Sequence, residues 1–172
     1  LFRSSFNDTV GERTTERGYK SAGVIIGNKV DSGLGGGICQ VSSTLYNAIL
    51  LANIKATERT HHTLPSSYVP LGRDATVDWG NIDYKFKNTL PYPIYIEGYA
   101  SGGTLGFNIY SNSSLKSKTY DIYNEVYERI PATCTKVNDD SLLAGQEEVT
   151  QGAYEGLKVR EIGRASCRER VS

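Results

Sequence analysis

Apolar residues recur at helical spacing in one long segment of the chain. After the cysteine of "GLGGGICQVSSTLYNAILLA", residues 33–52, apolar side chains return mostly at intervals of three and four positions: Val41, Leu45, Ala48, Ile49 and Ala52. This spacing places them on one face of an amphipathic helix, because an α-helix turns once in about 3.6 residues. We therefore predict a helix from Cys39 to about Asn53.

Elsewhere the pattern is that of short strands separated by turn residues. Ahead of the helix, "AGVIIG" at 22–27 predicts a strand and "NKVDSG" at 28–33 predicts a turn. After the helix, further segments are typical of strands: 54–59, 66–70, 74–79, 82–88, 92–100 and 103–111. The predicted fold class is α+β, with one principal helix packed on a mostly antiparallel sheet and followed by a partial all-β module.

The composition changes after the last of these strands. "SNSSLKSK" at 111–118 is polar, and a new strand pattern begins with "TYDIYNEVYERI" at 119–130. The final residues, "EIGRASCRERV" from Glu161, look like a translated sequencing-adapter read-through, and we expect the residues after Glu161 to pack against nothing. We accordingly divide the chain into a main domain, a connecting strand or linker, a truncated β module and an adapter-derived tail: 1–111, 112–130, 131–160 and 161–172.

Charge and hydropathy narrow the classes of partner. The 19 Lys and Arg balance 19 Asp and Glu, and no basic run alternates with aromatic residues, so nucleic acid is not an expected partner. The longest apolar run, at 48–52, is too short to cross a bilayer. Because the chain does not begin with Met, we interpret it as a piece of a longer protein, with any membrane anchor outside this fragment.

The glycine cluster ahead of the helix raises two candidate chemistries. A phosphate-binding loop needs a lysine and a hydroxyl directly after its glycines, but Ile38, Cys39 and Gln40 stand there. The alternative is a thiol in the first turn of a helix, where free amides and the helix dipole favour an anion such as a thiolate. The glycine amides would then supply an oxyanion hole. From the residues alone, an inert, buried cysteine stays equally open.

A nucleophilic cysteine needs a base, and the chain offers only the neighbours His61 and His62. On a strand they point to opposite faces, so one of them could face Cys39. The other interpretation is that both histidines are ordinary polar side chains in contact with solvent. A zinc site is not expected, since no second cysteine has ligand spacing, while a Cys39–Cys134 disulfide stays open. Three carboxylates could orient the base or merely cap turns: Asp74, Asp78 and Asp83.

Several motifs resemble the VanW-like domain family of bacterial cell-envelope proteins. They are "SFNDTVGERTTERGYKSAGVIIGNKV", "GGGICQVSSTLYNAILLA", "ERTHHTLPSSYVPLGRDATVDWG" and "FKNTLPYPIYI", which together cover about residues 1–111. Farther on, "IPATCTKVNDDSLLAGQEEVTQGAYEGLKVRE" resembles the start of the small β-rich G-five module that often follows such a domain.

The resemblance implies a cysteine-dependent L,D-transpeptidase that cross-links peptidoglycan stem peptides outside the cytoplasm, with no cofactor. The family's motifs place its cysteine at Cys39 and its histidine at His62, and "GRDATV" matches at Asp74, to which the resemblance assigns no role. We expect Cys39, His62 and Asp74 to be the catalytic residues. Relatives often carry another histidine two positions before the one at His62, and Thr60 stands there in this chain. His61 instead occupies a position that varies in the family, which weakens any role for it. The residues expected to contact substrate are Gly36, Gly37, Ser42, Ser43, Arg59 and Arg73. The competing hypothesis is a peptidoglycan-binding module without turnover.

Overall fold

The computed structural model describes residues 3–26, 29–150 and 152–167, and it confirms the α+β class. Its elements are β1 (Arg3–Ser5), α1 (Phe6–Val10), β2 (Ser21–Ile26), β3 (Lys29–Leu34), α2 (Ile38–Leu51), β4 (Ala56–Glu58), β5 (Lys85–Lys87), β6 (Tyr95–Ser101), β7 (Thr104–Tyr110), the 3₁₀ helix η1 (Ser113–Ser117), β8 (Lys118–Ile130) and β9 (Gly156–Cys167). No helix in these ranges is long and apolar enough to cross a membrane.

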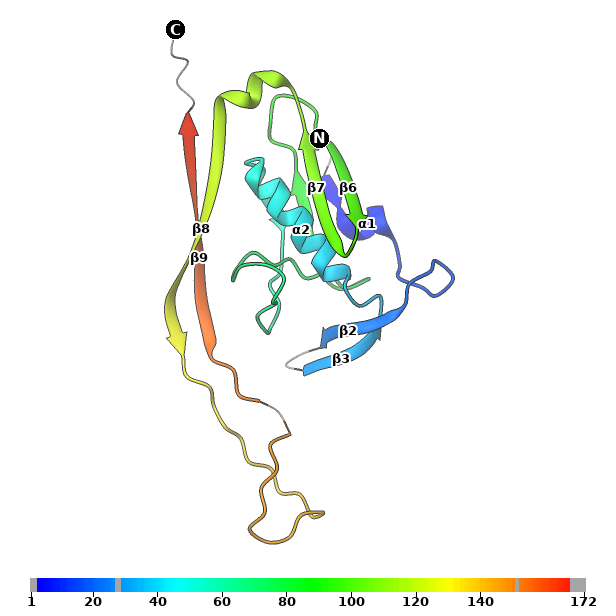
Figure 1. The fold of residues 1–172 in the computed structure, drawn as a ribbon, viewed down its shortest axis with the longest axis vertical. Coiled ribbons are helices and arrows are strands. Elements are labelled where there is room, and N and C mark those ends of the chain that lie inside the picture. Colours follow the sequence, from blue (N-terminus) through cyan, green and yellow to red (C-terminus); the bar gives the residue numbers. More distant parts are fainter. Residues whose placement is uncertain (1–2, 27–28, 151, 168–172) are drawn as a thin grey trace.

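The strands form several small antiparallel sheets where the sequence suggested one. β1, β5 and β4 form a three-stranded sheet in the order β1-β5-β4, and the hairpins β2–β3, β6–β7 and β8–β9 are two-stranded. Figure 1 shows β6–β7 lying over α2, while β8–β9 runs along the side of the body and extends past it. Helix α2 is therefore the element around which the rest of the domain is arranged.

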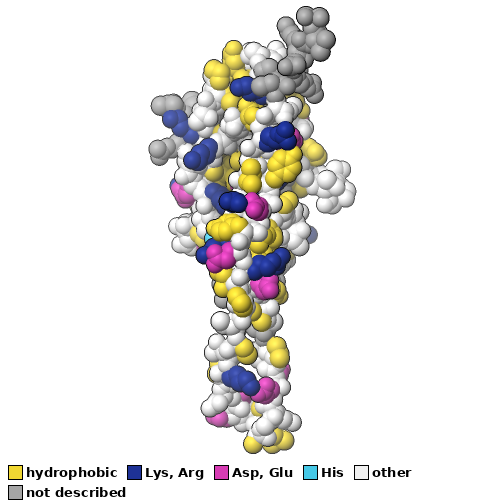
Figure 2. All heavy atoms as spheres, turned by 90° about the vertical axis from the view of Figure 1, so that its left-hand side faces the viewer, with side chains coloured by type: hydrophobic (Ala, Val, Ile, Leu, Met, Phe, Trp, Pro, Cys, Tyr) yellow, Lys and Arg dark blue, Asp and Glu magenta, His cyan; other side chains and the backbone are white. Residues whose placement is uncertain are grey.

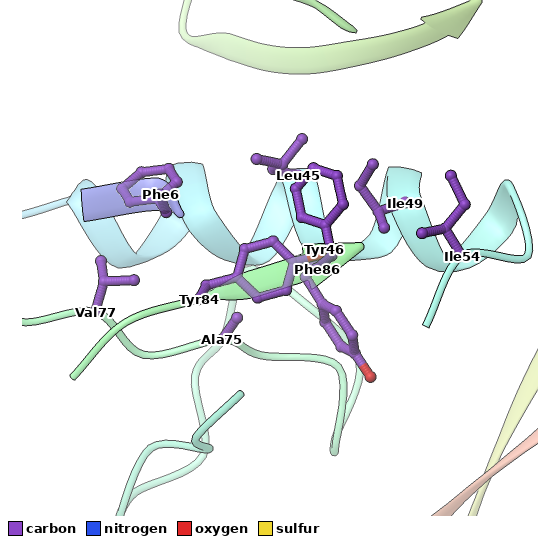
Figure 3. Close-up of a cluster of buried hydrophobic side chains, with 9 residues drawn as sticks. All are labelled: Phe6, Leu45, Tyr46, Ile49, Ile54, Ala75, Val77, Tyr84 and Phe86. Carbon is purple, nitrogen blue, oxygen red and sulfur yellow. The ribbon is translucent and has the colours of Figure 1, made fainter. Parts of the chain in front are cut away.

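The core lies along the inner side of α2 (Figure 3), and it joins α1, β5 and the segment at 75–77. Its buried apolar side chains are Phe6, Leu45, Tyr46, Ile49, Ile54, Ala75, Val77, Tyr84 and Phe86. The helix was predicted within one or two residues at each end, but its buried face is rotated relative to the prediction: Val41, Ala48 and Ala52 are only half-buried, and Ser42 and Ser43 are fully buried.

The rotation has a polar cause. The Ser42 hydroxyl donates to the Ala75 carbonyl at 2.6 Å, and the Ser43 hydroxyl accepts from the Ala75 amide at 2.8 Å. Because these bonds satisfy the backbone of Ala75, that residue can be fully buried without a neighbouring strand. The helix thus takes the place of a sheet partner for this segment.

This arrangement also explains which strand predictions fail. The strand expected at 66–70 is wrong, since those residues form no strand or bridge. The strand expected at 74–79 is also wrong, since only the isolated bridges Thr60–Thr76 and Asp78–Ile82 involve that segment. The turn expected at 28–33 is also wrong, because 29–34 forms β3 and pairs with β2. The strands expected at 54–59, 82–88, 92–100 and 103–111 are confirmed as β4, β5, β6 and β7 within their ranges. The strand expected at 22–27 is confirmed as β2, which begins one residue earlier, while residue 27 lies outside the described ranges.

The C-terminal part is a long hairpin. β8 pairs with β9 along its whole length, whereas 131–150 and 152–155 contain no helix or strand. Residues 162–167 continue β9, so the expectation that they pack against nothing is wrong. Backbone pairing depends little on side-chain identity, so it leaves the adapter interpretation a hypothesis. Residues 168–172 lie outside the described ranges.

The exposed face of this hairpin carries both charged side chains and large apolar ones such as Tyr123 and Tyr127. Lys158 pairs with Glu128, and Arg160 pairs with Glu125, each at 2.9 Å. Figure 2 shows basic and acidic side chains mixed with apolar ones over this side of the molecule. These exposed pairs contribute little individually to stability.

Candidate active site at the start of helix α2

The glycine loop turns the chain sharply into α2. Gly37 is the N-cap of the helix with φ +92°, a left-handed conformation that favours glycine. A Cβ on Gly36 would lie 2.5 Å from the Ala22 carbonyl carbon, so β2 passes directly against this loop. The turn brings Cys39 into the first turn of the helix, where backbone amides lack intrahelical acceptors.

The Cys39 thiol points from the helix toward the segment at 75–77. It is half-buried, packs against the core, and its sulfur lies 3.4 Å from the Val77 carbonyl oxygen. Cys134 is exposed, and both cysteines are free, so the disulfide left open by the sequence is not formed. The thiol is therefore available for chemistry.

His62 lies beside Cys39 and is held by Asp74. One Asp74 oxygen, Oδ2, accepts from the His62 backbone N–H at 2.5 Å and lies 2.6 Å from the ring nitrogen Nδ1. An ionised carboxylate can only accept, so Nδ1 carries the proton and the other ring nitrogen, Nε2, is the reactive end. The His62 side chain is only 5% exposed.

The electrostatics favour a charged imidazole. Burial disfavours the imidazolium and lowers the pKa of His62. The hydrogen bond to Asp74 and the interaction with the Cys39 side chain act in the opposite direction and outweigh burial, so the pKa of His62 is raised to about 9. Burial opposes ionisation of Asp74 too, yet its bonds to His62 hold the pKa of that carboxyl below its usual range. An imidazolium at His62 and the Asp74 carboxylate thus stabilise each other, with the Cys39 side chain next to His62.

Tyr68 is a member of the site that the sequence did not reveal. Its hydroxyl lies 3.5 Å from His62 Nε2, and the two rings meet edge to face with centroids 6.3 Å apart. Burial and the nearby Cys39 charge raise the pKa of Tyr68 to about 12, so it stays a neutral hydroxyl. Tyr68 comes from the loop at 66–70 that was expected to be a strand, and no local motif marks it.

The two arginines expected to bind substrate are committed to the protein itself. Arg59 bonds the Asp74 carbonyl at 2.7 Å and its carboxylate at 3.2 Å, bonds the Gly72 carbonyl, and lies over the Tyr46 ring. Arg73 donates to Asn124 at 2.7 Å and to the Ile122 carbonyl, which fastens β8 to the loop before Asp74. Arg59 therefore holds Asp74 directly, whereas Arg73 anchors the adjoining loop to β8.

Most of the remaining candidate residues do not contact Cys39 or the His62 ring. Ser42 and Ser43 are fully buried under Ala75, so they face the core rather than a substrate. His61 is exposed, and its Nδ1 lies 2.7 Å from the His62 carbonyl oxygen. Asp83 accepts from Ser5 at 2.5 Å and from Asn7 at 2.9 Å, whereas Asp78 accepts from Asn81 at 2.7 Å. Of the three candidate carboxylates, Asp74 orients His62.

Most of the chain is similar to known proteins. The family model described as VanW like protein matches residues 3–110, well over half of the chain. The chain belongs to the VanW-like family. It is also 46% identical over 114 residues to "Uncharacterized protein YoaR" of Bacillus subtilis (strain 168), a match covering 66% of this chain and 38% of that protein. No solved structure matches. The matched region contains Cys39, His62, Tyr68 and Asp74.

Proposed function

We propose that this VanW-like domain is a cysteine-dependent acyltransferase, specifically an L,D-transpeptidase of peptidoglycan stem peptides. The observation that carries the proposal is the arrangement of Cys39, His62 and Asp74 at the start of α2. A half-buried thiol beside a carboxylate-held imidazole is what nucleophilic acyl transfer requires. The peptidoglycan substrate and a site outside the cytoplasm are part of the proposal and come from the family resemblance.

In the first half-reaction, the Cys39 thiolate attacks the carbonyl carbon that joins the L-centre of the diamino acid to the terminal D-Ala. The carbonyl electrons move onto oxygen, and the amides of Gly37 and Cys39 stabilise that oxyanion, while the Ile38 amide donates to the Gly35 carbonyl at 3.2 Å. When the carbonyl re-forms, the C–N bond breaks, and the protonated Nε2 of His62 gives its proton to the departing amine. The products are a thioester on Cys39 and free D-Ala.

In the second half-reaction, the side-chain amine of another stem attacks the thioester carbonyl. His62 Nε2, now neutral, takes a proton from this amine, and the C–S bond breaks to release the thiolate. The new amide joins the diamino-acid residues of two stems. Asp74 stabilises the imidazolium each time it forms and keeps Nδ1 directed toward its carboxylate, which leaves Nε2 for proton transfer. The two half-reactions together need no oxidant, metal or cofactor.

The test follows D-Ala release and linked stems when the chain is incubated with tetrapeptide stem. Wild type is expected to form both, Cys39→Ala neither, and His62→Ala about 10²- to 10⁴-fold more slowly, the usual contribution of general acid–base catalysis. Cys134→Ser, which removes an exposed thiol, is the matched control and should behave as wild type. Stem binding by wild type without release of D-Ala would instead favour a binding module.

A further inference from the structure

Arg13 is a cation whose hydrogen bonding is incomplete. Its Nη2 donates to the Asn7 side chain at 2.8 Å, but Nε and Nη1 are buried and have no hydrogen-bond partner within the described ranges. None of the ion pairs formed by described residues includes Arg13. A buried donor without an acceptor costs about 1–3 kcal/mol, so two on one side chain require an explanation.

The guanidinium lies between two aromatic rings. Its central carbon is 5.8 Å from the centroid of Phe6 and 5.9 Å from that of Trp79. Phe6 is buried, whereas Trp79 is 42% exposed and so forms the outer wall of this sandwich. The rings stabilise the positive charge but supply no acceptor for the N–H groups.

This cation lies at the same end of α2 as the thiol. In Figure 3, Phe6 and Val77 lie toward the opposite end of the helix from Ile49 and Ile54. Val77 is the residue whose carbonyl contacts Cys39, and Trp79 follows two positions later. A Cβ on Gly35 would lie 2.9 Å from the Arg13 Cβ, so the stem of Arg13 rests on the glycine loop that leads into α2.

Arg13 differs in its hydrogen bonding from the two arginines that the sequence suggested as substrate ligands. Arg59 and Arg73 have their donors engaged by carbonyls, amides and Asp74, so neither is available for a ligand. Arg13 offers a planar set of donors suited to a carboxylate, which it would bind by charge-assisted hydrogen bonds. Its position at the same end of α2 as Cys39 suits the carboxylate adjacent to the scissile bond.

We propose that Arg13 binds the free C-terminal carboxylate of the stem peptide, the group carried away on the released D-Ala. This inference rests on the proposed function for the identity of the ligand. Since Nε and Nη1 are covered in the free protein, the indole of Trp79 moves aside when the carboxylate enters. The ligand class is therefore a peptide ending in a free carboxylate, and a C-terminal carboxamide is discriminated against.

Trp79 supplies the readout, because it is the single tryptophan of the chain. The full chain carrying Cys39→Ala is titrated with tetrapeptide stem ending in D-Ala and with the same peptide ending in D-Ala carboxamide, while indole fluorescence is recorded. The carboxylate peptide should give a saturable change, and the carboxamide should bind about 10- to 100-fold more weakly, as expected for loss of a hydrogen-bonded charge.

Arg13→Gln, added to the same protein, should make the two peptides bind equally, and Arg13→Lys should leave a reduced preference because it keeps the charge but loses the planar donors. Arg17→Gln is the matched control, since Arg17 donates only to the Val10 and Glu12 carbonyls. Melting curves establish that each variant is folded.

Equal binding of both peptides to the Cys39→Ala protein, no fluorescence change with either, or an unchanged preference in folded Arg13→Gln or Arg13→Lys would overturn the inference. The proposed function fails separately, if wild type binds the stem with this preference but never releases D-Ala.

Discussion

Replacing Asp74 by Asn tests the electrostatic design of the site most sharply. Asp74 Oδ2 holds His62 through two hydrogen bonds, at 2.5 and 2.6 Å, and Oδ1 receives one from Arg59 at 3.2 Å. Asn keeps the shape but removes the charge. Burial lowers the pKa of His62, and without the Asp74 charge its main opposing influence is gone, so this pKa should fall from about 9 to 6.5 or lower.

A fall from about 9 to 6.5 corresponds to about 3 kcal/mol of lost imidazolium stabilisation, at 1.36 kcal/mol per pKa unit. The His62 side chain is 5% exposed, so water screens little of this difference. At pH 7.5 the imidazolium fraction should drop from nearly all to about a tenth or less. Acylation of Cys39 should slow by about 10- to 1000-fold, because the leaving amine lacks its proton donor.

The assay is an NMR titration of the imidazole signals, for which His61 provides an internal control in the same spectrum. The free energy of unfolding gives a second readout. Because the folded pKa of His62 is raised, its contribution is complete below pH 6.5 and is lost as pH rises through about 9. Because the folded pKa of Asp74 is lowered, its contribution is lost only as pH falls below its ordinary value of 3.8.

The stability difference between wild type and Asp74→Asn should therefore be largest between about pH 4 and 6.5 and shrink above pH 9. An unchanged His62 titration in Asp74→Asn, with the fold intact, would refute the claim that this carboxylate sets the charge of the imidazole.

Three further substitutions probe the supporting structure. Tyr68→Phe should slow acylation about 3- to 10-fold in single-turnover assays without lowering the melting temperature, since it removes one hydroxyl 3.5 Å from His62 Nε2; an unaltered rate would exclude a role for that hydroxyl. Ser42→Ala should cost about 1–3 kcal/mol in denaturant unfolding, because its hydroxyl bonds the buried Ala75 carbonyl. Gly37→Ala should cost about 1–2 kcal/mol in the same measurement, since φ is +92° although a Cβ there has open space; a neutral effect would show that the turn relaxes.

Cys39 and His62 could be singled out from the sequence as candidates because both lie in local motifs. The helix period and the glycine cluster locate Cys39, and the scarcity of histidines leaves few candidates for the base. The choice of Asp74 among three carboxylates depends on the bridge between Thr60 and Thr76, which sets the two segments in register. Pairing between such distant residues is a tertiary fact that local patterns do not encode.

The remaining features escaped prediction for physical reasons. Serines are usually solvated, so the burial of Ser42 and Ser43 follows only once their bonds to Ala75 are known. The sequence does not distinguish an arginine bonded within the protein from one whose donors lack acceptors. Arg59 and Arg73, which are bonded internally, were therefore expected to bind substrate, whereas Arg13 was not singled out. Tyr68 reaches His62 from a loop whose path is set by packing rather than by strand pairing.

The most direct test of nucleophilic catalysis is the intact mass of the chain after brief incubation with tetrapeptide stem and rapid acid quench. Wild type should gain the mass of the stem minus D-Ala, peptide mapping should place it on Cys39, and neutral hydroxylamine should remove it as expected for a thioester. Cys39→Ala should show no gain. No adduct on wild type while D-Ala is released, or an adduct that persists in Cys39→Ala, would contradict the role given to this thiol.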